Sequence, residues 1–483
     1  MGTDKDCAFI GIDVGTSGVR GVAVSPAGQL LAEAEETLRQ DRRAPGGIHE
    51  QDPCEWWQAV CAVCQVLVKG LKARAGNVVI GGAAVTSTSG SLVVTDAEGR
   101  PLRPALLYDD SRGAEIASEL NRQGGGRTVR LGPSFSLVKA AWVAREEPKL
   151  WKQTRYILHP ADWLSGKLTG VFGVSDFTNA LKLGYDPENR SWTGSVQSAG
   201  LLCDRLPAVR RPAERIGQVE SAASAETGLP VRTPVMAGAT DGMASLIASG
   251  AGRRGDADTT LGTTIVWKVL HDAKPAVRGG IYYHLHPGGL WVPGAASNTG
   301  MGSLARPDAA TSLPEMDRLA ARCSPTRVIC YRLPGQGERF PFVNPEARSF
   351  VEGNAQDPAE FHAAQLQSIG FVERWGYETI EQCGVEIGDR VFSTGAAARS
   401  TVLSQLRASI LGKTVIRTRY PTAAFGAAIL AATGAAFRGS IFDAIQSMTT
   451  ILESHDPAAG LVPIYTEIYG AFRDACARRG YIA

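Results

Sequence analysis

Apolar residues alternate with small and polar residues along the first part of the chain, and short glycine turns interrupt the pattern. Residues 7–24 contain an apolar run, the turn Gly15-Thr16-Ser17-Gly18 and a second alternating stretch. This pattern predicts a β-hairpin rather than a strand that feeds a helix. Further strands are predicted at residues 29–32, 77–85 and 92–95.

Capping residues mark where helices begin. The run Asp52-Pro53-Cys54-Glu55 has Asp at the N-cap, Pro at the first helical position and Glu in the first turn. A second helix is predicted at residues 401–411, and a helix of small residues is predicted to begin at Asp241. Strand and helix patterns alternate along the chain, which is typical of an α/β fold.

A short pattern occurs twice, about half a chain apart. Val14-Gly15-Thr16-Ser17 and Leu261-Gly262-Thr263-Thr264 are both turns that enter apolar strands. The repetition predicts two related lobes that face each other over a cleft. The composition also changes between residues 203 and 234, which favours a domain boundary near residues 240–258.

The glycine turns suggest two kinds of structure. A Gly-Thr-Ser-Gly turn allows backbone N–H groups to converge on a phosphate, and its hydroxyls add donors, but an ordinary tight hairpin has the same sequence. The chain has no G-x-x-x-x-G-K-[ST] motif, which excludes a P-loop. The small residues from Gly395 to Ser400, between a strand and a helix, allow a flat base or ribose to lie against the backbone.

Two carboxylates lie at positions suited to phosphoryl transfer. Asp13 ends the first strand just before the phosphate-type turn, where a carboxylate can orient Mg²⁺ through water or bind a substrate hydroxyl. Asp241 begins its helix, so it is either a plain N-cap or a general base that takes the proton of an attacking hydroxyl. The two roles of Asp241 are compatible.

Composition and charge exclude other classes. The chain has 483 residues with 50 Lys and Arg against 48 Asp and Glu, and this near balance gives no support for a nucleic-acid binder. The polar residues 1–6 predict no secretory signal, and the run 423–437 is shorter than the ~20 residues that span a bilayer. Cys61 and Cys64, two of nine scattered cysteines, lie in an apolar helical pattern and are expected to be buried thiols. A reduced, cytoplasmic enzyme is expected.

Several segments together resemble the FGGY family of carbohydrate kinases, over about residues 8–435. The segments are Ile12-Asp-Val-Gly-Thr-Ser17, Gly47-Ile-His-Glu-Gln-Asp-Pro-Cys-Glu-Trp-Trp57, Pro101-Leu-Arg-Pro-Ala-Leu-Leu-Tyr-Asp-Asp-Ser-Arg112, Thr260-Leu-Gly-Thr263 and Gly395–Ser400. Their order and spacing match the family. The resemblance implies an α/β fold with two actin- and hexokinase-like (ribonuclease H-like) lobes and a central cleft.

The resemblance also implies roles for single residues. Asp241 matches the catalytic base, and Asp13 matches the carboxylate on the metal and substrate side, with Ser89 as a further sugar contact. The residues implied in binding ATP are Gly15, Thr16, Ser17, Thr260, Gly262, Thr263, Gly395, Arg399 and Ser400. The cofactors implied are ATP and Mg²⁺, the partner is a sugar, and the protein is expected to be a monomer or a homodimer.

The expected division of the chain has three parts. Residues 1–245 form a sugar-side lobe with the first phosphate motif, 246–437 a nucleotide-side lobe, and 438–483 a helical extension without a clear family counterpart. The adenosine loop reads Gly-Ala-Ala instead of Gly-Gly-Gly, and Thr422 stands where many relatives have Glu. These two differences bear on the affinity for the nucleotide, not on the class of reaction.

The sugar pocket differs from that of common xylulose kinases. Those kinases have Gly-Gln-Met-His-Gly where this chain has Thr86-Ser-Thr-Ser-Gly90. This segment, with Asn179–Tyr185 and Gly337–Pro341, is similar to a subgroup represented by cyanobacterial and plant D-ribulose kinases. The first hypothesis is therefore phosphorylation of D-ribulose at O5, and the alternative is a xylulose kinase or another pentulose or polyol kinase.

Two other classes remain open. An actin-like protein that binds a nucleotide or forms filaments would share the fold without the sugar chemistry. A metal enzyme that uses His284 and His286 is less favoured, because no acidic residue lies close in sequence and two exposed strand histidines are the usual outcome.

Overall fold

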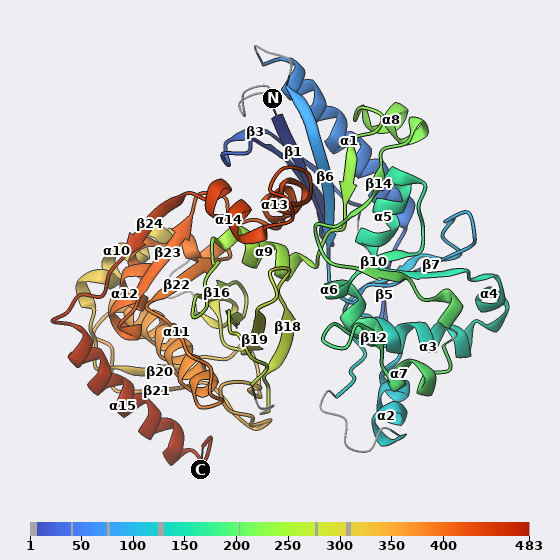
Figure 1. Cartoon of the computed structure of the whole chain (residues 1–483). Helices are drawn as coiled ribbons and strands as arrows, with labels where there is room; N and C mark the ends of the chain where they lie inside the picture. Colours follow the sequence, from blue (N-terminus) through green and yellow to red (C-terminus); the bar gives the residue numbers. More distant parts are fainter. Residues whose placement is uncertain are drawn as a thin grey trace. The chain divides into compact units, whose positions relative to one another are not determined.

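The computed structural model describes residues 7–39, 42–74, 78–123, 130–201, 203–275, 279–305 and 311–482. The N-terminal residues 1–6 and Asn77, both used in the sequence analysis, lie outside these ranges. The chain divides into two compact units (Figure 1). The first unit combines Met1–Ala248 with Thr422–Thr449, and the second combines Ser249–Pro421 with Thr450–Ala483.

The first unit contains most of the shorter elements. Its helices are α1 (Pro53–Lys72), α2 (Ala114–Gln123), α3 (Ser136–Glu146), α4 (Pro148–Gln153), α5 (Pro160–Thr169), α6 (Phe177–Ala180), α7 (Gly194–Ser198), α8 (Ser221–Thr227), α9 (Asp241–Ser249), α13 (Ala423–Ala435) and α14 (Ile441–Met448). Its strands are β1 (Cys7–Val14), β2 (Gly18–Val24), β3 (Leu30–Thr37), β4 (Arg42–Ala44), β5 (Ile48–Gln51), β6 (Val79–Ser87), β7 (Val93–Thr95), β8 (Ala105–Leu106), β9 (Tyr156–Leu158), β10 (Val174–Asp176), β11 (Tyr185–Asp186), β12 (Ser191–Trp192), β13 (Ala208–Arg210), β14 (Arg215–Gln218) and β15 (Pro234–Met236).

A mixed six-stranded sheet forms the centre of the first unit, in the order β14-β15-β6-β1-β2-β3. Strands β15, β6 and β1 are parallel neighbours, whereas β2 returns antiparallel to β1. Helices α1 and α13 pack against this sheet. In Figure 1 strands β1, β3 and β6 of this sheet and helix α1 are drawn in shades of blue, strand β14 in yellow-green, and α13, which comes from much later in the chain, in red.

Two glycines show that α1 and α13 cover opposite faces of the sheet. A Cβ on Gly11 of β1 would lie 2.0 Å from the carbonyl oxygen of Ala424 in α13, whereas a Cβ on Gly21 of β2 would lie 2.3 Å from Val63 of α1. Gly11 is paired with Val22 and Gly21 with Ile12, so the two glycines point to opposite faces. The close approach of α13 to β1 therefore requires the absence of a side chain at residue 11.

The second unit is built in a similar way. Its strands are β16 (Ala257–Leu261), β17 (Ile265–Val269), β18 (Tyr282–Leu285), β19 (Trp291–Ala296), β20 (Ile329–Tyr331), β21 (Phe350–Glu352), β22 (Arg390–Thr394), β23 (Thr414–Thr418) and β24 (Ile451–His455). Its helices are α10 (Leu313–Cys323), α11 (Pro358–Glu381), α12 (Thr401–Leu411) and α15 (Val462–Arg478). The main sheet has the order β18-β19-β17-β16-β22-β23-β24, and α11 and α12 pack on it.

The short sequence repeat corresponds to a repeat in topology. In the first unit, β1 and β2 form a hairpin and β6 lies parallel to β1. In the second unit, β16 and β17 form a hairpin and β22 lies parallel to β16. The prediction of an α/β fold with two related halves, each around a mixed sheet, is confirmed.

Several local predictions are confirmed as well. The hairpin is β1 and β2, and the third predicted strand lies within β3. The Asp52 carboxylate accepts the Cys54 N–H at 2.9 Å at the start of α1, with Pro53 as the first helical residue. The helix predicted at residues 401–411 is α12, with the same bounds.

The division of the chain differs from the expected one in its last third. The expectation assigned residues 246–437 to one lobe and 438–483 to a helical extension, but α13 and α14 belong to the first unit. The strand β24 pairs with β23, and α15 packs on α12, so the end of the chain is part of the second unit. The physical reason is that α13 is apolar on nearly every side, and its burial requires the first sheet.

Candidate functional site

Three predicted site residues lie at one edge of the first sheet. Asp13 of β1 is paired with Thr86 of β6, and an isolated bridge joins Ser87 of β6 to Thr240 after β15. The parallel strands β1, β6 and β15 therefore end together, and their ends carry Asp13, Ser89 and Asp241. The edge at the carboxyl ends of adjacent parallel strands is where α/β proteins bind ligands.

The carboxylates of Asp13 and Asp241 influence each other. Burial, with the Asp241 charge adding to it and Arg20 opposing it, raises the pKa of Asp13 to about 7. The Asp13 Oδ1 atom is buried without a hydrogen-bond partner among the described residues. Asp241 begins α9, as predicted, and its Oδ1 accepts the Gly242 N–H at 2.6 Å. A buried carboxylate oxygen without a partner is typical of a binding site.

Lys182 is a site residue that the sequence analysis did not single out. Its Nζ donates to the Ser89 carbonyl oxygen at 3.2 Å. Burial lowers the pKa of Lys182, and the Asp241 carboxylate opposes this shift, so the ammonium lies near that carboxylate. The signal was present in the segment Asn179–Tyr185, because a lysine among apolar residues before a turn is unusual, but sequence alone does not show what it faces.

The hairpin turn of the first unit presents open backbone donors. The Gly15 N–H donates across the turn to the Gly18 carbonyl oxygen at 3.0 Å. Within the described residues, the N–H groups of Thr16 and Ser17 have no hydrogen-bond acceptor. Gln51 fixes the turn from outside, since its Nε2 donates to the Thr16 carbonyl oxygen at 2.7 Å. Two consecutive N–H groups in a fixed turn form a site for an anionic oxygen.

The corresponding turn of the second unit also leaves two backbone N–H groups open. The Gly262 N–H donates to the Thr264 carbonyl oxygen at 3.1 Å, and in the described part of the chain the N–H groups of Thr263 and Thr264 have no acceptor. The turn packs on Gly300, where a Cβ would lie 2.4 Å from the Thr263 carbonyl oxygen. Thr263 itself is exposed. The two glycine turns thus share open N–H groups as well as sequence.

The predicted adenosine loop lies beside this second turn. Thr260 of β16 is paired with Thr394 of β22, and their hydroxyl oxygens are 2.8 Å apart. Gly395 follows β22 with φ +86°, and a Cβ there would lie 2.4 Å from the Leu261 carbonyl oxygen. Only glycine fits at this position, which brings the loop backbone against the end of β16.

The last two predicted nucleotide residues have different surroundings. Ser400 caps α12, since its Oγ accepts the Leu403 N–H at 3.2 Å and donates to Asp317 Oδ2 at 2.6 Å. Arg399 is exposed at the end of the 3₁₀ turn Ala396–Arg399. Ser400 therefore holds the helix start in place, and Arg399 is the residue with a free approach to solvent.

A buried carboxylate supports the second turn and makes stability depend on pH. Burial raises the pKa of Asp258 to about 6 from its ordinary 3.8, although Lys268 opposes this. Folding therefore favours the protonated carboxyl, and its stabilising effect is complete below about pH 4 and is lost as the pH rises through 6. The two pKa values differ by an amount that corresponds to about 3 kcal/mol.

We expect Asp258→Asn to remove this pH dependence. Urea unfolding of the wild type and the variant, measured from pH 4 to 7.5, should give a difference in unfolding free energy, wild type minus variant, that falls as the pH rises, because the amide cannot ionise. The wild type alone should lose the extra stability of about 3 kcal/mol between these limits. Wild-type and variant unfolding free energies that change in parallel from pH 4 to 7.5 would contradict the raised pKa of Asp258.

The remaining motifs have structural roles. His286 is buried, its Nδ1 accepts the Gly288 N–H at 3.0 Å, and burial lowers its pKa to about 3. His284 of β18 is partly buried, so the expectation of two exposed strand histidines is wrong for both. No cluster of three potential metal-binding side chains occurs among the described residues. Cys64 is buried in α1, as expected, and Cys61 is partly buried. None of the helices in the described ranges is long and apolar enough to cross a membrane.

Comparison with known proteins identifies the family. Residues 8–248 match the N-terminal domain, and residues 259–435 the C-terminal domain, of the FGGY family of carbohydrate kinases. The chain belongs to this family. It is 28% identical to a xylulose kinase of Escherichia coli K12, over 96% of this chain and 98% of that protein.

Solved structures show that the FGGY fold extends over the whole chain. A xylulose kinase from Rhodospirillum rubrum superposes with a TM-score of 0.85 at 24% identity, and the match covers 98% of both chains. A glycerol kinase from Plasmodium falciparum, solved with ADP, superposes with a TM-score of 0.84 at 17% identity and covers 99% of both chains. The expected pair of actin-like units is therefore the fold of this FGGY kinase.

Each unit of this FGGY kinase, taken by itself, offers features that suit a nucleotide or Mg²⁺. The turns at Gly15 and Gly262 offer open N–H groups, and Gly395 leaves room for a flat group next to the backbone. The unpartnered oxygen of Asp13 is a hard ligand of the kind that Mg²⁺ prefers. Mg²⁺ is commonly held by one or two carboxylates together with substrate phosphates and waters, so a single carboxylate is sufficient.

Proposed function

We propose that this FGGY kinase transfers the γ-phosphoryl group of ATP to the terminal hydroxyl of a ketopentose, with Asp241 as general base. The observation that carries the proposal is the meeting of Asp13, Ser89 and Asp241 at the ends of three adjacent parallel strands. Two carboxylates with a lysine beside them provide both acceptors and a donor for sugar hydroxyls.

The proposed reaction requires one proton transfer and one displacement. The sugar hydroxyl oxygen attacks the γ-phosphorus, the bond from that phosphorus to the β-γ bridging oxygen breaks, and ADP leaves. Asp241 accepts the hydroxyl proton late in this step, because the transition state is loose. Its position at the start of α9 keeps the carboxylate at the positive end of the helix dipole, which stabilises its charge.

The proposal assigns the nucleotide phosphates to the two glycine turns. Gly15, Thr16 and Ser17 in one turn and Gly262 and Thr263 in the other would donate to phosphate oxygens. Gly395 and Arg399 would lie against the adenosine, with Thr260 and Ser400 fixing the elements around them. Asp13 would hold Mg²⁺, which neutralises charge on the phosphates when it is bound.

D-Xylulose is the first candidate substrate. The E. coli relative that aligns with nearly the whole chain is named as a xylulose kinase, as is the R. rubrum structure. These names favour xylulose over the ribulose that the sequence segments suggest.

D-Ribulose is the second candidate, because the residues expected to line the sugar pocket differ in chemistry from those of common xylulose kinases. Residues 86–90 present hydroxyls and a glycine where common xylulose kinases have Met and His, and Lys182 lies against this segment. The two ketopentoses differ in the configuration of one hydroxyl. A change in the hydrogen-bond donors and acceptors of the pocket therefore changes which of the two ketopentoses is preferred.

An assay of ADP release with a panel of sugars tests the proposal. The panel contains D-xylulose, D-ribulose, pentitols and glycerol, each at several concentrations, and values of kcat/KM are compared. We expect a ketopentose to exceed glycerol and the pentitols. Nucleotide binding without sugar-dependent ADP release would contradict the proposal and favour the non-catalytic, actin-like alternative. Size-exclusion chromatography would show whether the protein is a monomer or a homodimer.

The proposal places the enzyme in the cytoplasm. In the described part of the chain no two cysteines are joined by a disulfide, and thiols persist in a reducing compartment.

Ser89→Ala is expected to weaken sugar binding. Loss of one neutral hydrogen bond lowers the binding free energy by about 0.5–1.5 kcal/mol, so KM for the sugar should rise by about 2- to 10-fold with little change in KM for ATP. Initial rates over a sugar titration measure this. Ser118→Ala, which removes a hydroxyl from the surface of α2, is the matched control. An unchanged KM would remove Ser89 from the pocket.

A further inference from the structure

The segment Ala237–Asp241 joins β15 to α9, and other elements hold its backbone on several sides. The Thr86 hydroxyl donates to the Ala239 carbonyl oxygen at 2.6 Å, and the Thr240 N–H donates to the Thr178 hydroxyl oxygen at 2.9 Å. A Cβ on Gly238 would lie 1.7 Å from the Val85 carbonyl oxygen, so the segment lies directly against β6. The residue just before the proposed base is thus fixed by a side chain 62 positions earlier in the sequence.

Asp176 determines which way the Thr178 hydroxyl points. The Thr178 Oγ1 donates its proton to Asp176 Oδ1 at 2.5 Å, and the same carboxylate accepts the Thr178 N–H at 2.7 Å. A hydroxyl has one proton, so its lone pairs remain for the Thr240 N–H. Asn179 holds the other oxygen, since its Nδ2 donates to Asp176 Oδ2 at 2.6 Å. Because the Asp176 carboxylate accepts the Thr178 proton, the Thr178 hydroxyl oxygen is left to accept the Thr240 N–H.

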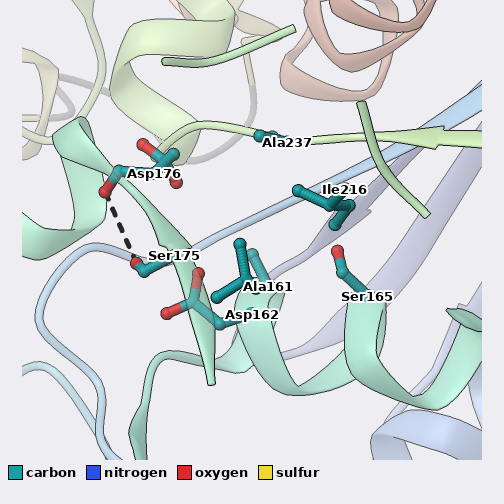
Figure 2. A pocket seen from close by; sticks show the side chains of 9 residues that line it. Ala161, Asp162, Ser165, Ser175, Asp176, Ile216 and Ala237 are labelled. Carbon is teal, nitrogen blue, oxygen red and sulfur yellow. Dashed lines mark hydrogen bonds between the residues drawn. The ribbon is translucent and has the colours of Figure 1, made fainter. Parts of the chain in front are cut away.

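The Asp176 carboxylate is buried but ionised at the pH of a kinase assay. It borders a cavity of about 10 Å³, room for about one water, which Asp162 and Ala237 also line (Figure 2). Burial, with Asp162 adding to it, raises the pKa of Asp176 to about 6. At pH 8 the group is an acceptor only, and hydrogen bonds to a charged acceptor are stronger than neutral ones.

We propose that Asp176 and Thr178 are positioning residues that fix the orientation of the Asp241 side chain by holding the backbone of Thr240, the residue before it. The inference rests on the proposed function, in which Asp241 is the base. Neither residue is proposed to touch the substrate. Misplacement of a catalytic group by about 1 Å lowers the rate by up to about 10²-fold, so a bond that fixes the preceding residue affects turnover more than binding.

Thr178→Val and Thr178→Ser test the proposal as a pair. Valine keeps the shape but removes the hydroxyl, whereas serine restores it. In ADP-release assays at pH 8, with the ketopentose of highest turnover, we expect Thr178→Val to lower kcat by about 10- to 100-fold, with KM for the sugar within about 3-fold of wild type. Thr178→Ser should recover kcat to within about 3-fold of wild type.

Thr227→Val is the matched control. Thr227 is buried in the same unit, and its hydroxyl donates to the Ala223 carbonyl oxygen at 2.6 Å within α8. Its thermal unfolding midpoint should fall, but its kcat should not. If Thr178→Val behaves like this control, or if Thr178→Ser is as slow as Thr178→Val, the positioning role is wrong. Should Thr178→Val fail to fold, Asp176→Asn replaces it, with a lower kcat as the supporting result and an unchanged kcat as the contrary one.

Asp241→Asn, assayed in parallel, separates the two proposals. Normal turnover in Asp241→Asn would overturn the base assignment and the positioning role together. Loss of turnover in Asp241→Asn with normal turnover in Thr178→Val would overturn the positioning role alone.

Discussion

Asp241→Asn is expected to lower kcat for sugar phosphorylation by about 10²- to 10⁴-fold, the usual contribution of a general base. The amide keeps the size of the side chain and can still accept the Gly242 N–H at the start of α9, so the fold should be unaffected. It cannot accept the proton of the attacking hydroxyl. Initial rates at saturating sugar and ATP, together with a thermal unfolding midpoint, measure both effects.

A second helix-start aspartate provides the control for this variant. Asp357 caps α11, where its carboxylate accepts the Glu360 N–H at 2.8 Å, and it is exposed. Asp357→Asn should change stability by no more than about 1 kcal/mol and leave kcat unchanged. Near-normal turnover in Asp241→Asn would show that Asp241 is a plain cap as well, and the proposed mechanism would fail.

Arg407→Met is expected to destabilise the protein by about 3–5 kcal/mol, because it leaves a buried carboxylate without its counter-charge. The Arg407 guanidinium donates to both Glu373 oxygens at 2.6 Å, and both side chains are fully buried in the second unit. Glu373 also accepts the Thr259 hydroxyl at 2.6 Å, which ties α11 to β16. Urea unfolding compared with wild type measures the loss.

Two further variants show whether the buried charge is the cause. Replacing both partners, as in Glu373→Met with Arg407→Met, removes the unpaired charge and should be less destabilising than Arg407→Met alone. Arg327→Met removes an arginine whose pairing with Glu467 is exposed to solvent, and it should leave the unfolding curve almost unchanged. An Arg407→Met protein as stable as wild type would contradict the expected role of the pair.

Local features of the fold were readable from the sequence because they depend on neighbouring residues. The hairpin around Gly15, the cap at Asp52 and the full extent of α12 were all predicted, and Asp241 was correctly placed at a helix start. Each of these depends on turn chemistry, capping or periodicity within a few positions.

Features that depend on distant residues were not predictable in this way. The burial of Lys182 against Ser89 and the bond from Thr240 to Thr178 join segments 93 and 62 positions apart. The apolar composition of residues 423–437 does not show which sheet covers α13. The sequence repeat correctly indicated two related halves. By contrast, no short sequence pattern indicates that Thr422–Thr449 returns to the first unit.

This return has a consequence for how the protein is made. The face of β1 at Gly11 is covered by α13, which the ribosome synthesises only after the whole segment 249–421. While residues 249–421 are translated, the apolar face of the first sheet at Gly11 is therefore not yet covered. An exposed apolar surface of this kind promotes aggregation, and chaperone binding during this period protects against it. A truncated chain that stops at Ala248 would remain permanently in that unfinished state.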